Sequence, residues 1–207
     1  MPDFSLEDAA HQRGHRIVAG VDEAGRGPWA GPVVAAAAVI DRERLSGELA
    51  AALDDSKKLK PEARAELFAR LGDCAEVAVG VAEVAEIDAV NILQATMNAM
   101  ARAVDGLAVS PDFVLVDGNR TPDLGGRAVE TAVKGDGRSL SIAAASIVAK
   151  VTRDRLMAEL AREHPGYGWE SNAGYGTAAH QAALARLGVT PHHRRSFAPI
   201  RDLLEKK

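Results

Sequence analysis

The sequence has a single cysteine, Cys74, among its 207 residues. An internal disulfide bond and a cysteine-rich zinc site are therefore both excluded. The residues around Cys74 are mostly apolar, which predicts that its thiol is buried as a small hydrophobic group. No apolar run reaches the roughly 18 residues that a membrane-spanning helix needs. The acidic start also lacks the pattern of a signal peptide, so we expect a cytoplasmic protein with no membrane segment.

Basic residues are not in excess, because 25 Lys and Arg stand against 29 Asp and Glu, for a formal net charge of −4. Proteins that bind nucleic acids usually carry an excess of positive charge, so this total argues mildly against that class. The charge is uneven, however, since basic residues and histidines gather in residues 181–207. Acids that bind metal ions also lower the total without facing a polymer. Net charge therefore leaves nucleic-acid binding open.

Two common hydrolase signatures are missing from the sequence. There is no Gly-x-x-x-x-Gly-Lys-Ser/Thr loop, which nucleotide hydrolases use to hold phosphates. There is also no nucleophile elbow and no spacing typical of a Ser-His-Asp triad. A nucleotide hydrolase and a serine hydrolase are therefore both disfavoured.

Hydrophobic periodicity and turn residues predict alternating strands and helices. This alternation is typical of an α/β layer architecture, and the length fits one domain with a small appendage. We expect a loosely held leader at 1–15, a main domain at 16–190 and a small helical C-terminal extension at 191–207. Strands are predicted at 16–21, 31–40, 76–82, 113–116 and 127–133, and helices at 61–71, 91–104, 141–163 and 178–187.

Acidic residues follow three of the predicted strands. Asp22 and Glu23 follow the first, Asp117 ends the fourth, and Asp136 comes just after the fifth. Ligands of open α/β sheets gather at strand ends, so these carboxylates are expected to meet. Oxygen ligands without paired His or Cys favour Mg²⁺ or Mn²⁺, and two such ions can assist displacement at a phosphodiester. Taken alone, Asp22 and Glu23 also fit a polar turn between two strands.

Several motifs, taken in order, resemble those of the type 2 ribonucleases H, the bacterial ribonuclease HII family. The resemblance covers about residues 16–200, and its first motif is highly specific. The motifs are VDEAGRGP at 21–28, DSKKL at 55–59, VDGN at 116–119, KGD at 134–136, AASIVAKVTRD at 144–154, GYGT at 174–177 and HRRSF at 193–197.

The resemblance implies a ribonuclease H-like mixed β-sheet flanked by helices, with a small helical C-terminal part. It implies a metal-dependent endonuclease that cuts the RNA strand of RNA–DNA hybrids and nicks beside single ribonucleotides in duplex DNA. The metal-binding and catalytic acids of the family correspond to Asp22, Glu23, Asp117 and Asp136, with Asp22 bridging two Mg²⁺ or Mn²⁺ ions. Asp154 is a rival for the fourth place, but an ion pair on a helix surface is enough to explain it, so Asp136 is favoured.

A nuclease that distinguishes ribose from deoxyribose must sense the 2′-OH group. The backbone of Gly25-Arg26-Gly27, here called the glycine turn, suits this role because glycine lets main chain approach a sugar closely. The resemblance assigns the same role to this turn, and it identifies Tyr175 with a tyrosine that stacks on the following deoxyribose. A buried aromatic is the alternative for Tyr175. One departure is Ala173, where many relatives carry a lysine, so a phosphate contact is missing there.

Basic and hydroxyl side chains supply further candidate contacts with the substrate. Lys57 and Lys58 are expected to meet backbone phosphates, and a solvated charged loop is the alternative. Arg194 and Arg195 are weaker candidates of the same kind. Ser139 and Ser146 fit substrate contact and helix capping or packing equally well. His164 and His180 are assigned no function.

Two other functional classes stay open from the sequence. A ribonuclease H-like nuclease for DNA junctions, or an integrase-type strand transferase, would also place acids at strand ends. A non-catalytic nucleic-acid-binding module would use the acids to hold a structural cation. The glycine turn and Tyr175 favour ribose sensing, so the expected partners are RNA–DNA hybrids and duplex DNA that contains ribonucleotides. We expect a monomer.

Overall fold

A mixed five-stranded sheet forms the centre of the protein, with strand order β3-β2-β1-β4-β5. The computed structural model describes residues 1–53 and 59–205. The β1–β2 and β2–β3 pairs are antiparallel, whereas β1–β4 and β4–β5 are parallel. This arrangement confirms the predicted α/β class with a mixed sheet. The strands are β1 (Val18–Ala24), β2 (Val33–Ile40), β3 (Ala75–Ala82), β4 (Phe113–Asp117) and β5 (Ala128–Ala132).

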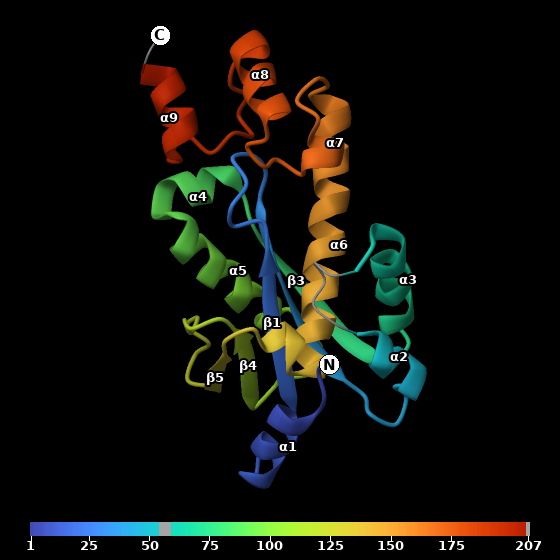
Figure 1. The fold of residues 1–207 in the computed structure, drawn as a ribbon. Coiled ribbons are helices and arrows are strands. Elements are labelled where there is room, and N and C mark those ends of the chain that lie inside the picture. Colours follow the sequence, from blue (N-terminus) through green and yellow to red (C-terminus); the bar gives the residue numbers. More distant parts are fainter. Residues whose placement is uncertain (54–58, 206–207) are drawn as a thin grey trace.

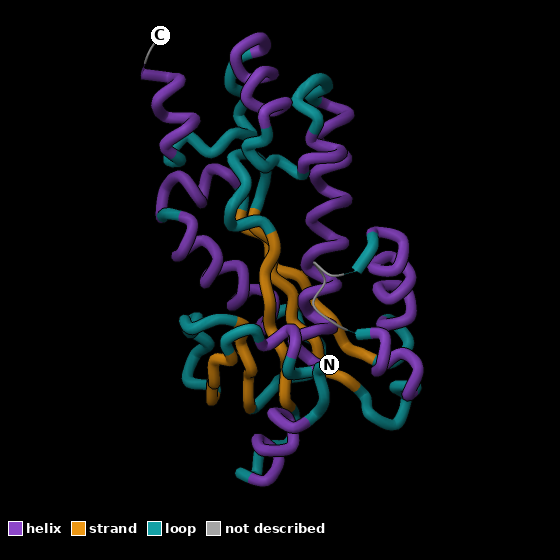
Figure 2. Tube along the Cα trace, viewed as in Figure 1, coloured by secondary structure: helices purple, strands orange, loops and turns teal. Residues whose placement is uncertain are grey.

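Helices cover both faces of the sheet (Figures 1 and 2). A hydrophobic core lies on each face of the sheet. Alternate residues of β2 belong to different cores, since Ala35 and Ala37 pack with α5 while Ala36 and Ala38 pack with α6. Among the described residues, no helix is long and apolar enough to cross a bilayer. The helices are α1 (Ser5–Gln12), α2 (Gly47–Ala52), α3 (Pro61–Leu71), α4 (Val84–Val90), α5 (Ile92–Asp105), α6 (Leu140–Glu163), α7 (Trp169–Asn172), α8 (Ala178–Leu187) and α9 (Ala198–Glu205), with a 3₁₀ turn, η1, at Gly135–Gly137.

The long helix α6 packs directly against the central strand β1. Their contact is so close that a Cβ atom on Gly20 would lie 2.2 Å from the backbone carbonyl carbon of Ser141. Glycine is therefore required at this point of β1. Because side chains alternate along a strand, Asp22 lies on the same α6-facing side of the sheet as Gly20. The packing of α6 thus sets how far Asp22 stands from the start of that helix.

The N-terminal segment, expected to be held loosely, is instead ordered and bonded to the start of α6. One oxygen of Glu7, Oε1, accepts hydrogen bonds from Ser139 Oγ at 2.6 Å and from the Ser141 amide at 3.0 Å. The backbone of Asp3 also exchanges hydrogen bonds with Arg138 and Leu140. The prediction of a loose leader was wrong because these partners lie more than a hundred residues away in the sequence.

Glu7→Ala is expected to destabilise the protein by about 2 kcal/mol, because it leaves the buried Ser139 hydroxyl and Ser141 amide without their acceptor, and a buried donor left unsatisfied costs about 1–3 kcal/mol. Urea unfolding followed by circular dichroism measures this loss. Asp8→Ala is the matched control on the same helix, since the exposed Asp8–Arg42 ion pair is worth about 0–1 kcal/mol. Equal effects of the two substitutions would contradict a special role for Glu7.

Other elements differ from the prediction mainly at their ends. Strand β1 runs through Asp22 and Glu23 to Ala24, because β2 continues to pair with it there. Helices α2, α4 and α7 lie in segments for which no helix was predicted. Cys74 is buried, as predicted. The expected helical C-terminal part is confirmed by α9.

Candidate active site

The predicted catalytic acids come from neighbouring parts of the sheet. Strands β1 and β4 are parallel, with Val21 opposite Val116, so Asp22 and Asp117 are the next residues along two adjacent strands. Asp136 lies in η1, just beyond β5, which is the neighbour of β4. The Gly135 amide donates a hydrogen bond of 2.6 Å to Asp117 Oδ1, and this bond ties η1 to the end of β4.

Asp22 is almost fully buried among like charges. Burial, followed by the charges of Glu23 and Asp117, raises the pKa of Asp22 well above its ordinary value, and Asp136 adds to this effect. The Glu23 amide donates a hydrogen bond of 2.7 Å to Asp22 Oδ1, which favours the ionised carboxylate. The four acids therefore interact electrostatically, and a cation among them would relieve their repulsion.

The four acids do not close around a single point in this conformation. Within the described parts of the chain, the three-residue group whose ligand atoms all lie within 4.8 Å of one another is a different one, at Glu163, His164 and His192. The acids thus lie near one another at the ends of neighbouring strands, without forming a tight cage.

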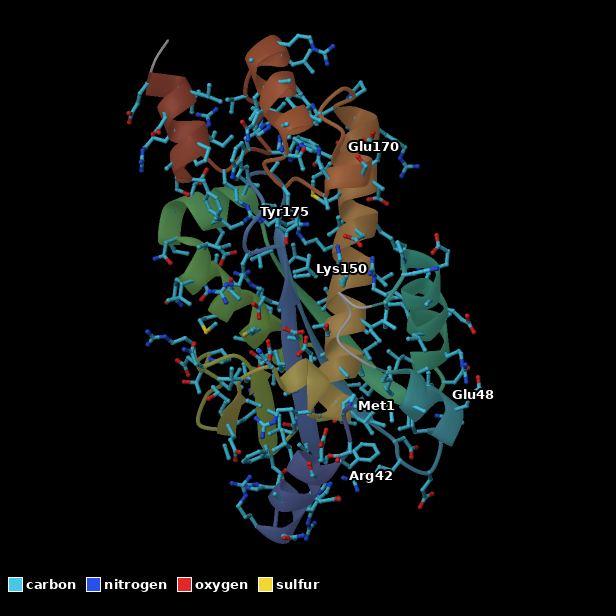
Figure 3. All side chains as sticks on the ribbon, in the orientation of Figure 1. Met1, Arg42, Glu48, Lys150, Glu170 and Tyr175 are labelled. Atoms are coloured by element: carbon cyan, nitrogen blue, oxygen red, sulfur yellow. The ribbon has the colours of Figure 1, made fainter. Side chains whose placement is uncertain are left out.

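A cleft of about 390 Å³ lies beside the acids and contains the glycine turn. Tyr175 faces this turn, because its Cε1 atom would lie 3.3 Å from a Cβ atom on Gly27. Tyr175 is 49% exposed, so its ring is available to a ligand and is not a core aromatic. Tyr175 and Lys150, both labelled in Figure 3, line this cleft. The other lining residues are Glu23, Ala24, Arg64, Ser146 and Arg153.

A smaller hollow adjoins the acids, where Glu23 and Arg26 line both cavities. The Arg26 guanidinium pairs with Glu23 Oε1 at 3.3 Å. Asp117 and Arg120 border this second hollow, together with α5 side chains. Lys57 and Lys58, the predicted phosphate contacts, lie outside the described residues.

Arg194 is not a surface contact for phosphate, contrary to the sequence-based expectation. Its side chain is completely buried. The guanidinium donates hydrogen bonds to the carbonyls of Gly25 at 2.6 Å, Arg26 at 2.9 Å, Gly31 at 2.9 Å and Pro32 at 3.2 Å. Burial lowers the pKa of Arg194 to about 9. Its role in the structure is to hold the glycine turn.

A second buried arginine, Arg153 of α6, supports the same region. It donates to the carbonyls of Pro32 at 3.0 Å, Ala173 at 3.0 Å and Ala30 at 3.2 Å. Burial lowers its pKa to about 10. Gly25 has φ +97°, and a Cβ atom there would lie 1.9 Å from Arg153 Nε. Only glycine fits this position of the turn.

His180, to which the sequence assigned nothing, is a buried link between Tyr175 and His193. Thr190 donates its amide hydrogen to His193 Nδ1 at 3.0 Å, so the proton of His193 lies on Nε2. His193 Nε2 lies 3.0 Å from His180 Nε2, which also accepts from Trp169 Nε1 at 3.1 Å. His180 Nδ1 then donates to the Tyr175 carbonyl at 2.9 Å. Its spacing from Ala183 and Leu184 was the available sign of burial.

The remaining candidates have structural partners. Asp154 Oδ1 pairs with Lys150 at 2.6 Å, and its other oxygen lies 3.5 Å from Arg64, so it forms the expected helix-surface ion pair. Asp136, in contrast, is among the charges that act on Asp22. Ser139 caps α6 by accepting from the Ile142 amide at 3.1 Å. Ser146 lines the cleft.

Comparisons with known proteins agree with one another. The family model described as Ribonuclease HII matches residues 19–200. A ribonuclease HII from Rhodospirillum rubrum is 62% identical over the whole of this chain and 93% of its own length. Ribonuclease H2 from Pyrococcus horikoshii superposes with a TM-score of 0.76 at 31% identity, over 92% of this chain and 98% of that one.

A further solved structure, Bst-RNase HIII in complex with Mn²⁺, superposes with a TM-score of 0.74 at 25% identity, over 96% of this chain and 72% of that one. Family match, sequence identity and fold all point the same way. The chain belongs to the ribonuclease HII family and is a ribonuclease H.

Proposed function

We propose that this ribonuclease H cuts the RNA strand of RNA–DNA hybrids and nicks on the 5′ side of single ribonucleotides in duplex DNA, leaving 3′-OH and 5′-phosphate ends. The observation that carries the proposal is the placement of four acids beside a cleft that contains the glycine turn and Tyr175. The acids suit metal-assisted chemistry at a phosphate, and the glycine turn with Tyr175 suits contact with a sugar.

Asp22, Glu23, Asp117 and Asp136 are the proposed ligands of two Mg²⁺ or Mn²⁺ ions. The fit rests on the donor set, because carboxylate oxygens are the ligands that these ions prefer. The like charges around buried Asp22 also call for a cation. Bound here, the ions would supply stabilisation of charge on the attacking and departing oxygens of the phosphodiester. The Mn²⁺ complex of the related enzyme supports this choice of ion.

The chain itself supplies the ribose check in this proposal. The carbonyls of Gly25 and Arg26 already accept hydrogen bonds from Arg194, so the amide groups of the glycine turn are the proposed contacts for the 2′-OH. Tyr175 would pack its exposed ring on the next sugar. Because Tyr175 lies against Gly27, the two sugars on either side of a ribonucleotide junction would be inspected together.

The alternatives are weighed by the same evidence. Family membership sets aside a binding module without catalysis. A DNA junction nuclease would cut substrates that contain no ribose, and it would have no use for a backbone turn that faces a sugar. The decisive property is therefore dependence on a ribose.

The test uses a labelled DNA duplex that contains one ribonucleotide, with a long RNA–DNA hybrid and an all-DNA duplex alongside. We expect a nick on the 5′ side of the ribonucleotide that requires Mg²⁺ or Mn²⁺ and disappears with EDTA. Cleavage of the hybrid alone would contradict the junction role of the glycine turn and Tyr175. Cleavage of all-DNA would favour the junction nuclease.

Tyr175→Ala is expected to slow cleavage at a single ribonucleotide by about ten- to a hundredfold. Loss of the ring's packing contact, at about 1–3 kcal/mol by analogy with a base stacked on an aromatic ring, gives this range at a factor of ten per about 1.4 kcal/mol. Tyr175→Phe keeps the ring and should retain most of the activity. Steady-state kcat/KM on the single-ribonucleotide duplex measures both variants. An unchanged value for Tyr175→Ala would rule out the sugar contact.

A further inference from the structure

We propose that Glu163, His164 and His192 form a second metal site, for Zn²⁺ or a similar transition-metal ion, separate from the acid centre. The ligand atoms of these three residues all lie within 4.8 Å of one another. They come from two distant segments, the end of α6 and the loop that follows α8. The site therefore depends on the fold and not on one local stretch of sequence.

The geometry is close to what such an ion needs. Zinc binds histidine nitrogen and carboxylate oxygen at about 2.0–2.2 Å in tetrahedral geometry, so the ligand atoms around one ion lie about 3.3–3.6 Å apart. The rings of His164 and His192 already lie close together, with their centroids 4.9 Å apart and their planes tilted by 56°. Glu163 is exposed, and its carboxylate already lies within 4.8 Å of a nitrogen of each ring. Small side-chain movements suffice to complete three protein ligands.

The chemistry of the donors selects the class of ion. Two imidazoles with one carboxylate suit Zn²⁺, Co²⁺ or Ni²⁺, whereas Mg²⁺ prefers oxygen ligands alone. The carboxylate of Glu163 adds negative charge to the two imidazoles, which suits a divalent cation.

The surroundings hold the two histidines in place. The ring centroid of Trp169 lies 6.0 Å from that of His164 and 6.4 Å from that of His192, so one buried aromatic ring packs edge-on against both. His192 directly precedes His193 and Arg194, the residues that support Tyr175 and the glycine turn. An ion at this site would tie the end of α6 to the loop that carries these supports (Figure 1).

The expected consequence is a more stable C-terminal part of the molecule. A ligand that binds only the folded state raises the unfolding temperature by mass action. The site plays no part in the proposed cleavage chemistry, so its failure would leave the proposed function untouched. Zinc is expected to act on stability whether or not Mg²⁺ is present.

The test measures Zn²⁺ binding by calorimetry and thermal melting in an Asp22→Asn/Asp117→Asn background, which disables the acid centre. We expect one equivalent to bind and the melting temperature to rise. Residues that merely support metal ligands are worth about 10- to 100-fold in affinity, so His192→Gln and His164→Gln should each weaken binding at least tenfold. His11→Gln, which removes an exposed histidine elsewhere, is the matched control.

Co²⁺ provides a readout that identifies the ligands. Bound Co²⁺ should give visible absorption typical of imidazole ligation, and its paramagnetism should shift the ring signals of His164 and His192 but not those of His11 and His15. Glu163→Gln, at an exposed position, repeats the test if a histidine variant fails to fold. Absence of stoichiometric binding, or equal binding in all variants, would overturn the proposal.

Discussion

Asp22→Asn is expected to abolish cleavage and, at the same time, to stabilise the metal-free protein. Activity should fall by about a thousandfold or more, because metal ions supply several kcal/mol of charge stabilisation, at a factor of ten per 1.4 kcal/mol. Stability should rise because the substitution removes a buried carboxylate that stands among three other acids. A gain of about 1 kcal/mol corresponds to about 2–4 °C in a protein of this size.

Two measurements check both halves of this prediction. Single-turnover cleavage of the ribonucleotide-containing duplex gives the activity, and thermal melting in EDTA gives the stability. Adding Mg²⁺ or Mn²⁺ should raise the melting temperature of the original protein and have little effect on Asp22→Asn. Asp105→Asn is the control, since Asp105 forms an exposed ion pair with Arg127. Full activity of Asp22→Asn would remove Asp22 from the metal site.

The sequence predicts the sheet and the position of the acids well, for a clear physical reason. Buried strands are short apolar runs, and a charge at the end of such a run is visible without any knowledge of the fold. Asp117 at the end of β4 is an example, because the parallel pairing with β1 then places it beside Asp22. Here the residue pattern along each strand and the pairing of the strands both place the acids at the same end of the sheet.

The supports of the site are not visible in the same way. Arg153 and Arg194 are polar residues whose partners are backbone carbonyls, mostly of distant segments, and a carbonyl has no sequence signature. The side-chain contact of His180 with His193 is equally hidden, because it forms only when the loop after α8 folds back. The pairing of Glu7 with Ser139 is hidden for a similar reason, since either residue alone fits a solvated helix or a helix cap. Long-range polar contacts of this kind emerge only when the chain is folded.

Arg194→Ala is expected to be the most destabilising single change near the cleft. The guanidinium satisfies four carbonyl groups around the glycine turn, and the side chain is completely buried. The substitution leaves these carbonyls without their donor, and each buried group left unsatisfied costs about 1–3 kcal/mol. Arg194→Lys keeps the charge but loses most of this support, because an ammonium group has three donors and no planar fork.

The loss should also reach the reaction, because Arg194 fixes the carbonyls of Gly25 and Arg26. These carbonyls share rigid peptide planes with the amides of Arg26 and Gly27, so Arg194 also fixes the direction of those two amides. A misplacement of about 1 Å can cost about a hundredfold in rate. We therefore expect the rate of cleavage at a single ribonucleotide to fall by about that factor, when it is measured at a temperature at which the variant is still folded. Urea unfolding and kcat/KM measure the two effects. Arg195→Ala is the matched control for stability, since it removes an exposed side chain and keeps the hydrogen bond from the Arg195 amide to Asp88. Equal stability of the two variants would show that the glycine turn holds its shape without Arg194.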